Sequence, residues 1–206
     1  MRGGCLLPMT ESNLAGAGAS GMLCITVPAD RIACFFPLLQ KGFDLGVLVG
    51  CPIRALLRDG LGLTDEYIET RIQTVFLDGK PVDDIDGARI RDGATLALAP
   101  AMPGLMGAML RRGGYYAPMR SGITHRDDAA PQGIAQGRIT VKLFGMAVRE
   151  LGLQLLERGI EVGAGDLARI VSELPGECLG GLGDLEGLEG QARVTLRVTI
   201  AQEGKK

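Results

Sequence analysis

The sequence has few of the residues from which nucleic-acid and metal sites are usually built. It contains no tryptophan, only 4% aromatic residues and a single histidine, His125. So few aromatic side chains disfavour a base-stacking surface, and one histidine excludes a His-rich metal site. The 22 basic and 24 acidic residues give a net charge of −2, which argues against binding to nucleic acid or to an anionic membrane. We expect neither a metal nor a cofactor.

Catalytic motifs are missing too. A Ser-His-Asp site would depend on His125, and no G-x-S-x-G nucleophile motif stands beside it. Asp83, Asp84 and Asp86 could together bind a divalent cation, but no calcium-loop pattern follows them. Solvated turn charges are the preferred interpretation of this acidic run. We therefore expect a protein that is not an enzyme.

No apolar run is long enough for a transmembrane helix. The best candidate, residues 94–110, has no charged residue but contains Pro100 and Pro103, and it is shorter than the roughly 20 residues that a span needs. Residues 1–21 include AGAGASG, which is typical of a flexible lead, and they make a poor signal peptide. Either Met1 or Met22 could be the true start, and we exclude residues 1–21 from the fold.

The cysteines indicate a reducing compartment. There are 5, widely spaced and without a C-x-x-C pair, which is typical of reduced thiols in a cytoplasmic protein. Cys24, Cys34 and Cys51 lie among apolar residues, and we expect them to be buried as small hydrophobic side chains. A reactive or metal-binding thiol is the alternative.

Residues 22–104 show predicted elements in the order β-β-α-β-β. Apolar and β-branched residues predict strands over 22–27 and 42–50, and Pro37 between them admits a helix, a bulge or a broken strand. The stretch CPIRALLRDGLG, residues 51–62, predicts a helix with Pro52 at its first position. Thr64 is a candidate N-cap for a further turn.

Two Asp-Gly turns lie near the end of this region. Residues 72–82 predict a hairpin around Asp78 and Gly79, because a type I′ turn needs two residues with positive φ. A second Asp-Gly turn at 92–93 leads into a last strand over 95–99. A hairpin, a crossing helix and two further strands make a mixed sheet with one face covered, which is the β-grasp arrangement.

The rest of the chain predicts a connector over 105–137 and a smaller α/β unit over 138–201. This unit has a strand (138–144), two helices (147–159 and 165–174, the second with Asp166 as N-cap), an acidic Gly-rich loop (179–190) and an alternating strand (192–201). Two strands are unstable alone, so the unit docks on the first domain, gains a third strand from GIEV, or dimerises. The predicted fold is α/β, of the α+β type.

The stretch VFLDGKPVDDIDGARIRDGATLALAPAMPG, residues 75–104, resembles the C-terminal half of the MoaD/ThiS-type sulfur carriers, which share the ubiquitin-like β-grasp fold. The shared features are a strand, a glycine turn, a polar residue with Pro and Val, an acidic linker, an Asp-Gly turn and an apolar strand. In that family a terminal Gly-Gly is adenylated by an activating enzyme and becomes a thiocarboxylate. The resemblance covers about residues 22–104.

The chain departs from the family where the carriers end. Pro103-Gly104 stands where Gly-Gly is expected, and the chain continues for about another hundred residues. LRRGG, residues 110–114, resembles the end of ubiquitin but is internal. Two readings follow: a protease exposes Gly114 for an ATP-dependent activating enzyme, or the segment is a structural connector, which we prefer. The carrier-tail candidates are Arg111, Arg112, Gly113 and Gly114.

Two further groups of residues are candidate sites. The first group is an apolar strip, and the preferred interpretation is that it packs on the protein. It could instead dock a partner or be buried in a homodimer. Its members are Met102, Leu105, Met106, Met109 and Leu110. The second group could line a pocket for an anionic ligand. The preferred interpretation is that these residues belong to a loop that packs its aromatic side chains on the core. Its members are Tyr115, Tyr116, Arg120 and His125.

The sequence thus predicts a non-catalytic, ubiquitin-like protein that binds a protein partner in sulfur or cofactor metabolism of the molybdopterin or thiamine type. The alternatives are a processed sulfur carrier activated at Gly114, and a ligand-binding protein or enzyme that uses the loop 115–125.

Overall fold

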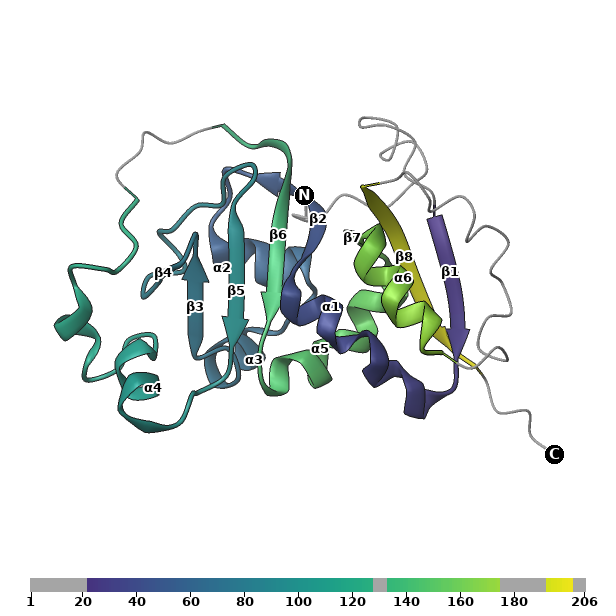
Figure 1. Cartoon of the computed structure of the whole chain (residues 1–206). Helices are drawn as coiled ribbons and strands as arrows, with labels where there is room; N and C mark the ends of the chain where they lie inside the picture. Colours follow the sequence, from purple (N-terminus) through teal and green to yellow (C-terminus); the bar gives the residue numbers. More distant parts are fainter. Residues whose placement is uncertain (1–21, 128–132, 175–191, 202–206) are drawn as a thin grey trace. The chain divides into compact units, whose positions relative to one another are not determined.

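The computed structural model describes residues 22–127, 133–174 and 192–201 (Figure 1). Its helices and strands confirm the α/β class expected from the sequence. The chain forms two compact units: unit 1 consists mainly of Leu45–Ala147, and unit 2 of the residues up to Asp44 together with those from Val148 onward. The expected lead over 1–21 and the expected Gly-rich loop over 179–190 lie outside the described residues.

Unit 1 contains a mixed sheet. Its strands hydrogen-bond in the order β2-β6-β5-β3-β4. β5 and β6 are parallel, and β3 is antiparallel to both β5 and β4. The strands are β2 (Phe43–Val49), β3 (Thr74–Leu77), β4 (Lys80–Pro81), β5 (Thr95–Ala99) and β6 (Ala135–Leu143).

The helical segments of unit 1 are short. They are α2 (Ile53–Ala55), which continues into the π-helical turn η3 (Leu56–Gly60), α3 (Asp65–Thr70), α4 (Gly104–Leu110) and the 3-10 turn η4 (Ala117–Arg120). The Thr64 hydroxyl accepts a hydrogen bond from the Tyr67 amide at 3.1 Å, which confirms the predicted N-cap of α3. Pro52 is the N-cap of α2 and not, as predicted, its first residue. The fixed φ of proline suits either position at a helix start.

The hairpin between β3 and β4 follows the predicted turn chemistry. Asp78 has φ 51° and Gly79 has φ 77°, the pair of positive values that a type I′ turn requires. The Asp78 carboxylate also accepts a hydrogen bond from the Thr95 amide at 2.8 Å, so the turn is tied to the first residue of β5. At the second Asp-Gly turn only Gly93 has positive φ, 75°.

The first strand does not lie where the sequence predicted it. β1 (Met22–Val27) belongs to unit 2, where it pairs in parallel with β8 (Arg193–Ile200), Met22 opposite Thr195 and Val27 opposite Ile200. The place between β2 and β5 is taken by β6, which the sequence assigned to the C-terminal unit. Parallel pairing joins segments far apart in the chain, so local residue patterns do not reveal it.

Unit 2 has its own sheet edge and helices. β1, β8, β7 (Ile160–Gly163) and the start of β2 are neighbours in that order, and β7 is the third strand expected from GIEV. Asp44 of β2 lies opposite Glu161 of β7. The helical segments are η2 (Ala29–Phe35), α1 (Phe36–Lys41), α5 (Met146–Arg158) and α6 (Ala164–Ser172). Pro37 thus lies in the first turn of a helix.

Three expectations about unit 2 need correction. Gly163 is the N-cap of α6, and Asp166 instead accepts a hydrogen bond from the Lys41 ammonium at 2.6 Å. Cys24 and Cys34 are exposed, whereas Cys51, in unit 1, is buried as expected. Cys24 occupies an outward position of β1, where burial alternates from residue to residue; an apolar neighbourhood in sequence does not specify the face.

Among the described residues, no helix combines the length and the apolar character that crossing a bilayer would need.

Candidate functional site

The connector after β5 is an ordered element of unit 1. Of the predicted connector, residues 105–137, the structure describes 105–127 and 133–137, and the last three residues already belong to β6. Residues 105–127 are hereafter called the connector. Pro103 precedes α4 in an extended conformation, and Gly104 opens the helix with φ 76°. A Cβ on Gly107 would clash with the carbonyl of Met102, so this helix approaches its own lead-in too closely for any side chain there. The turn Arg111–Gly114 and η4 follow.

Arg120 holds the connector together. Its side chain is 1% exposed, and its Nη2 donates to the Asp83 carboxylate at 2.6 Å. Nε donates to the Met109 carbonyl at 2.6 Å, and Nη1 donates to the Thr124 hydroxyl at 2.8 Å. A buried guanidinium needs this number of partners because an unpaired charge is costly inside a protein. One side chain therefore joins α4, η4 and the loop that follows β4.

The same Asp83 oxygen also fixes the double glycine. The Gly113 amide donates to Asp83 Oδ1 at 3.0 Å, and Gly113 has φ 61°, a value that favours glycine. The Gly114 amide donates to the Arg111 carbonyl at 3.2 Å. These contacts make the Arg-Arg-Gly-Gly segment a closed turn in the folded chain.

Arg112 joins this turn to α3 and to the residue that precedes β3. Its amide donates to the Gln73 carbonyl at 2.8 Å, and its Nη2 donates to the Ile68 carbonyl at 3.1 Å and to the Glu69 carboxylate at 2.9 Å. Glu69 also pairs with Arg54 at 2.7 Å. The Arg54 hydrogen bond, with a smaller contribution from Arg112, lowers the pKa of Glu69 from its ordinary value.

The end of the connector is anchored on the hairpin. The His125 amide donates to the Pro81 carbonyl at 2.8 Å, while His125 Nε2 is buried without a hydrogen-bond partner among the described residues. Asp127 accepts from the Arg89 amide at 3.0 Å and from Arg91 Nη2 at 2.8 Å. Burial opposes ionisation of Asp127, but these hydrogen bonds outweigh it and lower its pKa.

Several of the exposed side chains of this anchored segment are large and apolar. Leu105 and Met106 on α4 are 67% and 66% exposed, and Met119 on η4 is 74% exposed. α4 and η4 contact one another, and Tyr115 and Ile123 are further exposed side chains of the connector. We call this set the α4–η4 surface: Leu105, Met106, Tyr115, Met119 and Ile123.

The α4–η4 surface corrects part of the packing expected for the apolar strip. Met102, Met109 and Leu110 are half-buried, in keeping with packing, but Leu105 and Met106 point into solvent. Tyr115, expected to pack on the core, is 90% exposed. It meets Tyr116 edge to face, with ring centroids 5.1 Å apart.

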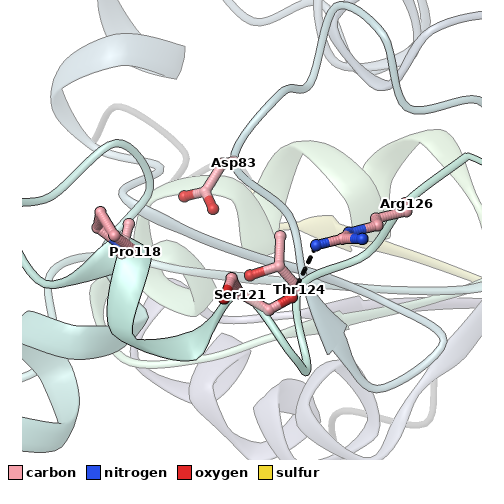
Figure 2. A pocket seen from close by; sticks show the side chains of 6 residues that line it. Asp83, Pro118, Ser121, Thr124 and Arg126 are labelled. Atoms are coloured by element: carbon pink, nitrogen blue, oxygen red, sulfur yellow. Dashed lines mark hydrogen bonds between the residues drawn. The ribbon is translucent and has the colours of Figure 1, made fainter.

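A solvent-open hollow of about 270 Å³ lies beside the Arg120 anchor (Figure 2). It is lined by Asp83, Ala117, Pro118, Ser121, Thr124 and Arg126. The predicted pocket residues Tyr115, Tyr116, Arg120 and His125 are not among them. Arg120 instead hydrogen-bonds to two of the lining groups, Asp83 and Thr124, and so positions them. The loop 115–125 named in the sequence analysis includes Ser121 and Thr124, but no motif marked these side chains or Arg126, and only the fold of the connector brings them together.

The acidic run after β4 does not act as one cluster. Asp83 pairs with Arg120, whereas Asp84 Oδ1 accepts the amides of Asp86 and Gly87 at 3.0 and 2.8 Å. Asp86 pairs with Arg54 at 2.6 Å, and this hydrogen bond lowers the pKa of Asp86. The part of the chain that the structure describes holds no group of three or more His, Cys, Asp or Glu side chains arranged for a metal ion.

Comparison with protein-family models, with curated proteins and with solved structures gives no match for this chain.

Proposed function

We propose that the protein is a non-catalytic binding module that docks a protein partner on the α4–η4 surface. The observation that carries the proposal is the exposure of Leu105, Met106 and Met119 on two elements that contact each other. Exposed apolar side chains scattered singly are normal, but a group of them on one segment marks an interaction site. Methionine side chains suit such a site because they adapt their shape to a partner.

The rigid attachment of this surface supports the proposal. Arg120 and Arg112 fix the backbone beneath it through hydrogen bonds to Met109, Asp83 and Gln73. A surface that is already ordered loses less conformational entropy when it binds, so more of the contact energy contributes to affinity. The exposed Arg111 at the end of α4 favours a partner segment that combines apolar residues with an acidic one.

The relationship to the MoaD/ThiS-type carriers is part of the same proposal. Unit 1 has the expected sequence of β2, helix, β3, β4 and β5, and β6 occupies the place beside β2 and parallel to β5. We infer a β-grasp sheet whose first strand is supplied from the C-terminal side of the chain, as in a circular permutation. The free thiols of Cys24, Cys34 and Cys51 support a reducing, cytoplasmic location.

The processed-carrier alternative is less well supported by the geometry. Activation at Gly114 requires cleavage of the connector and release of Gly113 from Asp83. Cleavage there would also separate α4 from Arg120, whose Nε bonds to the Met109 carbonyl. The contacts favour a structural role for the double glycine.

The test is site-specific photo-crosslinking in the cells that make the protein. A photoreactive residue is placed at Met106 or at Met119, and a matched control carries it at Glu66, an exposed residue of α3. We expect one shared adduct from positions 106 and 119, absent from position 66 and lost when Arg111→Glu is added. Equal adducts from all three positions, or none from 106 and 119, would overturn the proposal. An adduct of twice the chain mass would identify a second copy as the partner.

A further inference from the structure

Two opposite charges face the hollow beside Arg120 without pairing with each other. Figure 2 shows the Asp83 carboxylate and the Arg126 guanidinium on different sides of it. Asp83 uses Oδ1 for Arg120 and Gly113, and its Oδ2 has no hydrogen bond within the described structure. Arg126 makes one long contact, from Nη2 to the Ser121 carbonyl at 3.5 Å. Both charged groups therefore keep binding capacity that the described residues do not use.

We propose that this hollow binds a small free α-amino acid in its zwitterionic form. The ammonium group meets Asp83 Oδ2 and the carboxylate meets Arg126, whose planar guanidinium can bind a carboxylate through two hydrogen bonds. The Ser121 hydroxyl makes no hydrogen bond to any described residue, and it can donate to the carboxylate or accept from the ammonium. The inference is independent of the partner-docking function, because its residues are not those of the α4–η4 surface.

The charge balance selects a zwitterion over a ligand with a single charge. Arg120 already neutralises Asp83 at 2.6 Å, so the site has a net positive charge from Arg126 and attracts a simple amine only weakly. A carboxylate alone satisfies Arg126 but leaves Asp83 Oδ2 without a partner. Only a ligand that carries both groups meets both, and an α-amino acid, with its ammonium and its carboxylate on one carbon, is a small ligand of this kind.

The size and walls of the hollow restrict the side chain. A volume of about 270 Å³ lies below the range of sites for drug-sized ligands. Ala117 and Pro118 supply an apolar wall, which suits the small apolar side chain of alanine or valine. Arg120 fixes Asp83 and Thr124, while the exposed Arg126 is free to close over the bound carboxylate.

The test is isothermal titration of the full chain with L-alanine and L-valine, and with propionate and ethylamine as ligands that carry one charge each. We expect the amino acids to bind at least about tenfold more tightly than either analogue, with NMR shifts centred on the amides of Ser121 and Thr124. Arg126→Gln should weaken alanine binding at least about fivefold, while Lys80→Gln, an exposed cation of the same unit, should leave it unchanged.

Three results would overturn the inference. The first is propionate binding as tightly as alanine, which indicates a simple anion site. The second is dialanine, with its charges further apart, binding as well as alanine. The third is the absence of heat and of NMR shifts at tens of millimolar alanine. Circular dichroism of Arg126→Gln shows that a loss of binding does not come from unfolding, since this exposed side chain makes one long contact among the residues that the structure describes.

Discussion

The buried Arg120 guanidinium pairs with the partly exposed Asp83 carboxylate, Nη2 to Oδ1 at 2.6 Å, and this ion pair joins the loop after β4 to η4 of the connector. The two residues are 37 positions apart, and every feature discussed as a site lies within reach of this pair. It fixes the double glycine, it supports the α4–η4 surface, and its Asp83 side chain lines the hollow. The pair makes the connector part of unit 1.

Replacing Arg120 should destabilise the protein more than replacing any exposed arginine of the connector. Arg120→Met leaves the Met109 carbonyl without its donor and Asp83 without its cation, at a cost of about 2–3 kcal/mol. The estimate is at the lower end for a buried pair because the Asp83 side chain is 31% exposed. Urea unfolding measures the change, and Arg126→Gln is the control, expected within about 0.5 kcal/mol. Equal stabilities of the two variants would show that the ion pair is not an anchor.

Lowering the pH should reduce the stability of the folded protein, because it protonates the carboxylates that bind Arg54. The pKa values of Asp86 and Glu69 are lowered, first by their hydrogen bonds to Arg54. A group with a depressed folded pKa contributes stability above its unfolded pKa, about 4 for these residues, and loses it as the pH falls through the folded value. Arg54→Met should therefore reduce stability at neutral pH, by about 1 kcal/mol for such exposed pairs, and the difference should shrink as the pH falls through the lowered pKa values of Asp86 and Glu69.

Urea unfolding of both proteins between pH 7 and pH 3 provides the measurement. Lys80→Met serves as the control, because Lys80 is exposed on β4 and has no role in this cluster. A difference between wild type and Arg54→Met that stays constant over the whole range would indicate lost packing of the arginine stem and not lost charge.

The sequence predicted those parts of the fold that depend on neighbouring residues. The Asp78-Gly79 turn needs two positive φ values, and Asp and Gly are residue types that adopt them. Thr64 caps α3 with its own hydroxyl. The position of β1 was not predictable in this way, because Ile25 would fit any sheet edge with an apolar face. Arg120 was named for a pocket, but its burial depends on Asp83, and no local pattern connects the two.

Two glycines allow backbone strain to be separated from packing. Gly79 has φ 77°, a value that would strain any other residue, whereas Gly46 does not have a positive φ. A Cβ at either position would meet nothing within 4 Å. Gly79→Ala should cost about 1 kcal/mol because alanine avoids the left-handed region. Gly46→Ala in β2 should be neutral or slightly stabilising, since alanine has less freedom to lose on folding. Thermal unfolding of both variants checks the pair, and a larger loss for Gly46→Ala would contradict the assignment of the turn.

The intact mass of the protein from the cells that make it tests the meaning of the double glycine. We expect chains that continue beyond Gly114, because Gly113 is held by Asp83 and Arg112 by Gln73 and Glu69, so a protease meets a closed turn. Asp83→Asn weakens this closure and should make the turn more sensitive to added protease, with Asp84→Asn as the control. A native species that ends at Gly114, above all one with sulfur in place of a carboxylate oxygen, would reverse the assignment. The contacts of Asp83 would then hold a carrier tail until it is released, and α4 would belong to that tail.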